Sequence, residues 1–289
     1  MKYIITYLSL ILLAGFLITG CSEVRKDLPV QPSTSVVHGE GFSKVGNPNF
    51  HGNFIRQHDW EMKNCQQCHV GYNAGATGVS CKTCHKSDAG PEACNTCHGD
   101  FNVPQFIAPP RDASGNTQTT ARGVGAHTSH LYSTALSKAV ECQECHVVPT
   151  AVYQPGHINN SVEIVFGTFT KAKALSTPVY NSADQTCANT YCHGNFAFSK
   201  DSAAVQDQYI FTGTTITGNN FTPQWVKVDG SQKQCGTCHG LPPQGHLGVG
   251  VFTLTSCGGS GCHFGVVDES GKIIDQNKHI NASVNVRGK

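Results

Sequence analysis

Residues 65–98 read CQQCHVGYNAGATGVSCKTCHKSDAGPEACNTCH, so the pattern Cys-x-x-Cys-His occurs three times in one short stretch. The two thiols of such a motif add to the vinyl groups of a porphyrin, and the adjacent histidine reaches the iron, which makes the pattern the attachment signature of c-type haem. A stretch this short cannot wrap three haems separately. We therefore expect these three cofactors to touch one another.

Seven motifs of this kind run along the chain, and we number them in chain order. Motifs 5 and 7 have four residues between their cysteines, whereas the others have two. The seven motifs are, in order, Cys65, Cys68 and His69; Cys81, Cys84 and His85; Cys94, Cys97 and His98; Cys142, Cys145 and His146; Cys187, Cys192 and His193; Cys235, Cys238 and His239; and Cys257, Cys262 and His263. The sequence therefore predicts seven covalently bound haem c groups.

Two other interpretations of the cysteines are a disulfide framework, which is common in exported chains, and, for the long-spaced pairs, a zinc site. Fourteen of the 15 cysteines fall into pairs, and a histidine directly follows every pair. A zinc site needs four ligands from paired knuckles rather than this arrangement. The pattern favours haem.

Composition limits the fold. The 289 residues carry only 13% charged side chains and a formal net charge of +1, so nothing indicates a nucleic-acid partner. Gly is abundant and no amphipathic stretch is long enough to bury a face without cofactors. We expect a mostly irregular multihaem cytochrome c, with short helices at the haem motifs, a few short β-strands or hairpins within residues 162–170 and 209–228, and haems as its core.

The chain begins with a predicted lipoprotein signal peptide at residues 1–20. Residues 4–18 form an apolar run that is short for a membrane span, and the run leads into Ile-Thr-Gly followed by Cys21. This ending resembles the lipobox of bacterial lipoproteins, which predicts lipidation of Cys21, a flexible tether over residues 21–37, and, from Ser22, the outer membrane. An ordinary signal peptide or an uncleaved anchor are the alternatives.

Eight histidines lie outside the motifs: His38, His51, His58, His127, His130, His157, His246 and His279. Each iron has a second axial position, so seven irons need seven distal ligands, and mainly bis-His ligation is predicted with one histidine to spare. His127 and His130 lie on one side of a helical turn, so they must serve two different haems. His38, nearest the tether, is the weakest candidate. Met62 is the only methionine beyond the signal, so His/Met ligation applies to at most one haem.

An internal repeat organises the chain. The first copy runs from motif 3 through Pro109-Pro110, His127 and motif 4 to His157, and the second runs from motif 6 through Pro242-Pro243, His246 and motif 7 to His279. His157 therefore corresponds to His279, and His127 or His130 to His246. The predicted modules are an N-terminal three-haem module at 38–100, a first repeat copy at 94–165 that shares the third haem and adds the fourth, and a C-terminal three-haem module at 166–289.

Motif 5, followed by motif 6 with Gly-x-Pro-Pro and then by His-Ile-Asn, resembles the repeats of multihaem outer-membrane c-type cytochromes of dissimilatory metal-reducing bacteria. The matching residues are Cys187, Cys192, His193, Gly194, Trp225, Cys235, Cys238, His239, Gly240, Pro242, Pro243, His246 and His279. The resemblance implies electron transfer at the outer membrane toward an extracellular acceptor, from a lipid-anchored protein on the periplasmic face or cell surface. Other multihaem cytochromes and an outer-membrane porin are the implied partners.

The predicted function is that of a heptahaem cytochrome that carries electrons from haem to haem, without catalytic residues of its own. The alternative is a multihaem oxidoreductase with one open-site haem, which would reduce a small nitrogen or sulfur oxyanion. That alternative requires an iron without a distal histidine.

Overall fold

A computed structural model describes residues 38–69, 72, 80–100, 107–132, 134–159, 161–259 and 262–287. The predicted signal peptide, Cys21 and the tether lie outside the described residues. Within the described part, none of the helices is both long and apolar enough to cross a membrane. The chain divides into two compact units, with the boundary between Asp59 and Trp60, and each unit is described by itself.

The first unit is built around helix α2 (His51–Gln57). The ring of Phe42 packs against that of Phe54 in this helix, with 6.1 Å between ring centroids, and the ring of Phe54 stacks on His58 at 4.1 Å. Nδ1 of His51 bonds to the carbonyl oxygen of Phe42 at 3.0 Å, and Nδ1 of His58 to that of Phe54 at 2.8 Å. His51 in the helix and His58 at its C-cap therefore have ring orientations that are fixed by the backbone.

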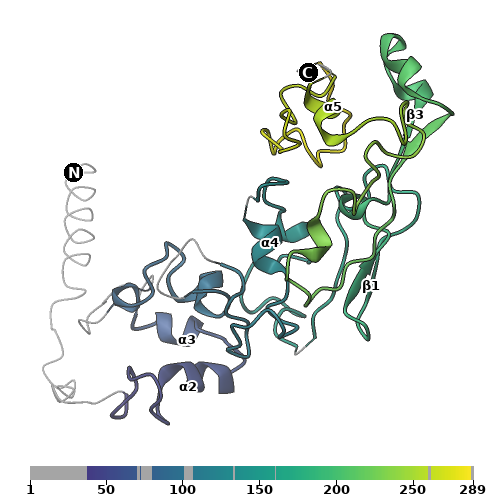
Figure 1. Cartoon of the computed structure of the whole chain (residues 1–289). Helices are drawn as coiled ribbons and strands as arrows, with labels where there is room; N and C mark the ends of the chain where they lie inside the picture. Colours follow the sequence, from purple (N-terminus) through teal and green to yellow (C-terminus); the bar gives the residue numbers. More distant parts are fainter. Residues whose placement is uncertain are drawn as a thin grey trace, which may run out of the picture. The chain divides into compact units, whose positions relative to one another are not determined.

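The second unit consists of short helical turns joined by long irregular connections (Figure 1). The α-helices are α3 (Lys63–Gln66), α4 (His127–Leu131) and α5 (Leu254–Gly259), and the 3-10 turns are η3 (Cys81–Thr83), η4 (Gly90–Glu92), η5 (Cys94–Thr96), η6 (Cys142–Glu144), η7 (Tyr191–His193), η8 (Lys200–Ser202), η9 (Val205–Ile210) and η10 (Ser231–Lys233). Every motif except motif 6 contains part of one of these turns.

The four regular motifs at the start of the chain share one backbone geometry. In motifs 1 to 4, the amide of the motif histidine donates to the carbonyl oxygen of the first cysteine, over 2.8 to 2.9 Å. This bond closes one turn of helix, so the two thiols and the imidazole leave the backbone in a fixed relation. A helical turn at each of these motifs is therefore part of how the motif presents its ligands.

Two antiparallel two-stranded sheets complete the secondary structure. Strand β1 (Val179–Asn181) pairs with β2 (Thr186–Ala188), and β3 (Ala197–Ser199) pairs with β4 (Thr215–Thr217). The expectation of strands at 162–170 is wrong, because this segment ends in a turn and bonds to motif 4 instead of to a strand, through Val165 N to Cys145 O and Gly167 N to Glu144 O. Within 209–228 only β4 forms a strand.

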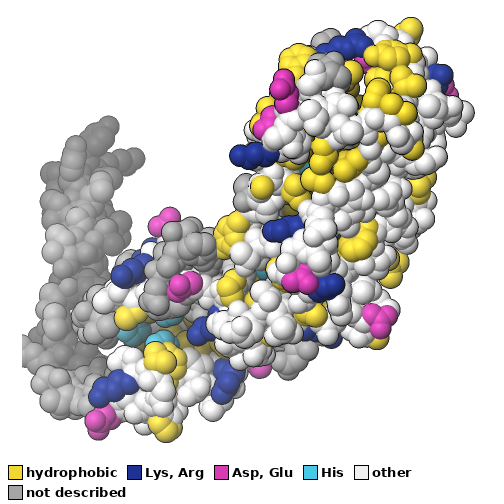
Figure 2. All heavy atoms as spheres, viewed as in Figure 1, with side chains coloured by type: hydrophobic (Ala, Val, Ile, Leu, Met, Phe, Trp, Pro, Cys, Tyr) yellow, Lys and Arg dark blue, Asp and Glu magenta, His cyan; other side chains and the backbone are white. Residues whose placement is uncertain are grey.

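The side chains of the described residues form only a small core. Val124, Tyr191 and Phe196 are among the few buried apolar residues, whereas Val205 and Val251 are 83% and 76% exposed. Figure 2 shows hydrophobic side chains in several separate patches on the surface of the second unit. The prediction of a mostly irregular fold with short helices and small hairpins is confirmed.

Candidate haem-binding sites

Five motif histidines each face one histidine from outside the motifs. The pairs, with the distance between ring centroids, are His98 with His157 at 6.2 Å, His146 with His127 at 6.1 Å, His193 with His130 at 6.0 Å, His239 with His279 at 6.4 Å, and His263 with His246 at 6.4 Å. We call these sites 3, 4, 5, 6 and 7, after their motifs.

These separations have the value that two imidazoles have when they bind one metal ion from opposite sides. A metal–imidazole nitrogen bond is about 2 Å long. The ring centroid lies about 1.1 Å beyond that nitrogen, which gives about 6.2 Å between centroids across the metal. Direct stacking would bring rings closer, as with His58 on Phe54 at 4.1 Å. The residues present therefore fit an iron between each pair.

The tautomer of the candidate distal ligands is fixed in the same way at each position. Seven histidines outside the motifs bond through Nδ1 to a backbone carbonyl oxygen, over 2.6 to 3.0 Å: His51, His58, His127, His130, His157, His246 and His279. A ring that donates from Nδ1 leaves the lone pair of Nε2 for a metal, and this outer contact orients the ligand.

The angle between the two ring planes separates the sites into two groups. The planes differ by 20° at site 4, 35° at site 3 and 37° at site 7. They differ by 63° at site 5 and 69° at site 6. Three sites are thus closer to parallel, and two are closer to perpendicular.

The pairs give the internal repeat a structural meaning. In the first copy, both histidines of site 4 lie in the sequence between the two histidines of site 3. In the second copy, both histidines of site 7 lie between the two histidines of site 6. His127, rather than His130, therefore corresponds to His246. We call the nested segments 94–157 and 235–279 the first and second cassettes.

Helix α4 connects the first cassette to site 5. Its first residue, His127, faces motif 4, and His130, one turn later, faces motif 5. The second cassette has Val249 three residues after His246, where the first has His130. Site 5 thus lies outside the repeat and takes its second histidine from the first cassette.

Burial dominates the electrostatics of these sites. It lowers the pKa of His127 to about 4 and that of His193 to about 4. Charge repulsion from His146 lowers the pKa of His127 further, and repulsion from His130 lowers that of His193 further. Both rings are therefore neutral at pH 7, which is the form that binds a metal.

Neighbouring motifs also influence the pKa values of each other's free thiols. Burial raises the pKa of Cys192 to about 12, and charges on Cys145 and Cys238 raise it further. Burial likewise raises the pKa of Cys142, and charge on Cys94 raises it further. Motifs 3 and 4, 4 and 5, and 5 and 6 therefore lie within electrostatic reach of one another.

Motifs 5 and 6 are also joined through their backbones. Asn219 donates from its backbone amide to the carbonyl oxygen of Cys238 at 2.9 Å, and from Nδ2 to Gly236 at 2.9 Å and Thr237 at 3.2 Å. Gly194 follows the histidine of motif 5, with φ of +93°. A Cβ atom on it would overlap the carbonyl oxygen of Cys238, so glycine permits this close approach.

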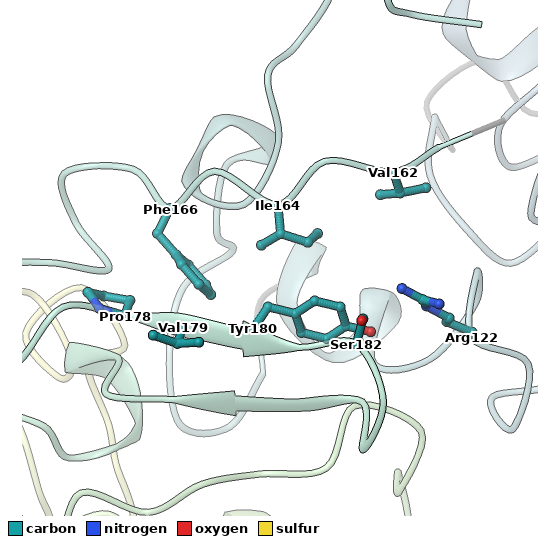
Figure 3. Close-up of a pocket in the computed structure, with 8 residues that line it drawn as sticks. All are labelled: Arg122, Val162, Ile164, Phe166, Pro178, Val179, Tyr180 and Ser182. Atoms are coloured by element: carbon teal, nitrogen blue, oxygen red, sulfur yellow. The ribbon is translucent and has the colours of Figure 1, made fainter. Parts of the chain in front are cut away.

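A shallow groove of about 340 Å³ lies between the segment 162–166 and strand β1 (Figure 3). Val162, Ile164 and Phe166 line one side, and Tyr180 lies across from them. The guanidinium carbon of Arg122 lies 5.8 Å from the centroid of the Tyr180 ring. The groove thus places a cation–π contact beside the chain that leads into α4.

Among the described residues, all fourteen motif cysteines carry free thiols, and no cluster of three or more metal-ligating side chains forms a direct metal site. The thiols are therefore available for attachment to haem. His69 and His85 of motifs 1 and 2 lie in the second unit, whereas His38, His51 and His58 lie in the first. The pairing of these five histidines remains a prediction.

Residues 186–239, which contain motifs 5 and 6, match the family described as the Geobacter CxxxxCH...CXXCH motif. The match supports a multihaem c-type cytochrome. No curated protein and no solved structure matches the chain. The motifs imply covalently bound haem c, and the histidine pairs above supply this cytochrome with residues that suit both axial positions at five of its sites.

Sequence reasoning singled out the candidate ligands but missed residues that hold them. Tyr191, in the long spacer of motif 5, accepts a hydrogen bond from the backbone amide of Ala282 in the loop that follows His279. The segment 219–221 links motifs 5 and 6, because the amide of Phe221 donates to His193 and that of Asn219 to Cys238. Trp225, noted only as part of a resemblance, touches both histidines of α4. The four-residue spacer of motif 5 is the sequence signal that could have indicated such a role.

Proposed function

We propose that this protein is a seven-haem c-type cytochrome, mainly with bis-His ligation, that carries electrons from haem to haem. The observation that supports this most directly is the set of five histidine pairs with ring centroids 6.0 to 6.4 Å apart. A haem with two protein ligands has no open position for a small substrate, which favours electron transfer over catalysis. No residue is assigned a role as acid, base or nucleophile.

The order of the sites suggests a route. Sites 3 and 4 belong to the first cassette, and sites 6 and 7 to the second. Site 5 connects them, because His130 comes from helix α4 of the first cassette, while the segment 219–221 joins motif 5 to motif 6 through the Phe221 bond to His193 and the Asn219 bond to Cys238. Motifs 1 and 2 precede the first cassette in the chain, and we propose that they continue the route at that end.

The chain's own residues have three tasks in this function. The motif cysteines fix each porphyrin covalently, and backbone carbonyls hold the imidazoles in one tautomer. Burial keeps these imidazoles neutral and lowers the polarity around the iron, which is one way a protein tunes a haem potential. Haem supplies the reversible one-electron chemistry.

We further propose that the protein is an outer-membrane lipoprotein that takes part in extracellular electron transfer, with metal oxides as the class of terminal acceptor. The lipobox-like sequence ending at Cys21 and the match of residues 186–239 support this proposal. Its partners would be other multihaem cytochromes and an outer-membrane porin. Protease treatment of intact cells tests the location, since cleavage without lysis requires exposure at the cell surface.

The intact mass of the purified protein tests the number of haems and the lipidation of Cys21. Seven haems are expected, and Cys187→Ala and Cys257→Ala should each weaken attachment at one long-spaced motif, as Cys142→Ala should at a regular one. Visible and electron paramagnetic resonance spectra of the oxidised protein should show low-spin ferric haems. A high-spin ferric signal with turnover of nitrite or a similar oxyanion would instead support the oxidoreductase alternative.

A further inference from the structure

The indole of Trp225 lies against two histidines that belong to different sites. Its ring centroid is 4.8 Å from that of His127, with the planes at 87°, and 5.8 Å from that of His130, with the planes at 30°. His127 belongs to site 4 and His130 to site 5. One side chain therefore touches the candidate distal ligands of two neighbouring sites.

Trp225 is held in place from the side of motif 5. Its backbone amide donates to the carbonyl oxygen of Gln185 at 2.6 Å, and the amide of Cys187 donates to that of Pro223 at 3.0 Å. These bonds tie the segment that carries the indole to the strand that begins motif 5. The backbone that carries the indole is thus attached to motif 5.

The far edge of the indole is held from the side of α4. Nε1 of Trp225 donates to the carbonyl oxygen of Arg122 at 2.8 Å, and the guanidinium of Arg122 lies over the ring of Tyr180 (Figure 3). Gly125 has φ of +42°, and a Cβ atom on it would overlap the indole. The chain leading into α4 is therefore shaped to receive this ring.

We propose that Trp225 is a positioning residue shared by sites 4 and 5, which fixes the planes of the His127 and His130 imidazoles. This inference rests on the proposed function. The Nδ1 bond to a carbonyl anchors one corner of each imidazole but still permits the ring to pivot. An indole packed edge-on against one ring and tilted against the other restricts that pivot at both.

The plane of an axial imidazole can be observed, because the angle between the two imidazoles of a low-spin ferric haem sets its electron paramagnetic resonance g values. We expect Trp225→Leu, with all haems present, to shift two signals, those of sites 4 and 5. Trp225→Phe, which keeps a ring but loses the N–H to Arg122, should shift the same two signals by less. His127→Ala and His130→Ala assign these signals, since each should lose one of them. Lys227→Gln, an exposed change in the same loop, is the matched control and should leave the spectrum unchanged.

An unchanged spectrum in Trp225→Leu with full haem content would overturn the proposal, and so would shifts confined to sites 3, 6 and 7. If Trp225→Leu does not accumulate with full haem content, Trp225→Phe and Gly125→Ala decide the matter. Either the signals of sites 4 and 5 shift in both, as the proposal requires, or the proposal is wrong. A failure of the proposed function itself would look different, because the wild-type protein would then lack the low-spin signals.

Discussion

The hydroxyl oxygen of Tyr191 accepts a hydrogen bond from the backbone amide of Ala282 at 2.7 Å. Tyr191 lies between the two cysteines of motif 5, and Ala282 follows the second histidine of site 6 by three residues. Both Ile280 and Ala282 have positive φ, at 55° and 61°, so this loop adopts a conformation that its residue types do not favour. The spacer of motif 5 thus holds the loop that follows His279, the candidate distal ligand of site 6.

Tyr191→Phe removes only the hydroxyl that holds this loop. We expect the free energy of unfolding of the haem-loaded protein to fall by about 1 kcal/mol, since the Ala282 amide loses its partner. We also expect the resonance signal of site 6 to shift. Thermal unfolding and the ferric spectrum measure the two effects. Tyr209→Phe is the control, because Tyr209 is 59% exposed; equal effects of the two substitutions would contradict the role given to Tyr191.

Gly194→Ala tests the backbone contact between motifs 5 and 6. The new methyl group would overlap the carbonyl oxygen of Cys238, and φ at this position is +93°. Strained backbone alone costs about 1–3 kcal/mol, and the overlap adds to that cost. We expect less protein with full haem content and easier proteolysis of what forms.

Gly213→Ala provides the comparison for that experiment, because a Cβ atom there meets no other atom within 4 Å. Normal haem content and normal protease resistance of Gly194→Ala would show that the close approach of motifs 5 and 6 is not required.

His130→Ala and His127→Ala form a matched pair on one helix. His130→Ala removes the candidate distal ligand of site 5, and His127→Ala removes the candidate distal ligand of site 4. Each variant should retain covalently attached haem while one haem becomes high-spin, because its iron loses a strong axial ligand. The resonance spectrum should lose a different low-spin signal in each variant. Loss of the same signal in both would mean that the two histidines serve one site.

The repeat order of the sequence predicted much of this arrangement. Motif order and the placement of His157 and His279 were sufficient to anticipate equivalent ligands, because each copy presents its landmarks in the same order. The spacing of His127 and His130 predicted two separate sites, since one helical turn places both rings on the same side. In the structure, His157 faces His98 and His279 faces His239, whereas His127 and His130 face different motifs.

The positioning contacts could not be predicted in this way, because they join residues far apart in the chain. Trp225 meets Arg122 across 103 positions, and His279 bonds through Nδ1 to the carbonyl oxygen of Leu136 across 143. The segment 162–170 was expected to form strands because its residues alternate, but the amides of Val165 and Gly167 donate to motif 4 instead. Local pattern does not reveal such long-range partners.

Asp112 gives a pH-dependent prediction outside the haem ligands. Burial raises the pKa of its carboxyl group, but hydrogen bonds from the side chain and amide of Asn116 and the amide of Ser114 outweigh this, so the pKa lies below its ordinary value. A depressed folded-state pKa stabilises the protein above the unfolded pKa of about 4, and this contribution is lost as pH falls through the folded value.

Asp112→Asn should therefore lower the free energy of unfolding by about 1–2 kcal/mol at pH 7, because charge-assisted hydrogen bonds are replaced by weaker ones. The difference from wild type should shrink below about pH 4. Denaturant unfolding of both proteins at several pH values measures it. Asp201→Asn, at an exposed position, should show little difference at any pH. A difference that stays constant down to acid pH would rule out the carboxylate as its source.

The ring-plane angles predict the form of the ferric spectrum of the wild-type protein. Low-spin haems with nearly parallel imidazoles give rhombic signals, whereas nearly perpendicular imidazoles give signals with one large g value, because the two iron orbitals that bind the imidazoles become similar in energy. Sites 5 and 6, at 63° and 69°, should be of the second kind, and sites 3, 4 and 7, at 20° to 37°, of the first. His130→Ala should remove a large-g signal, and His127→Ala a rhombic one. The opposite assignment would mean that the imidazoles rotate when the iron binds, and that the carbonyl bonds to Nδ1 do not determine their planes.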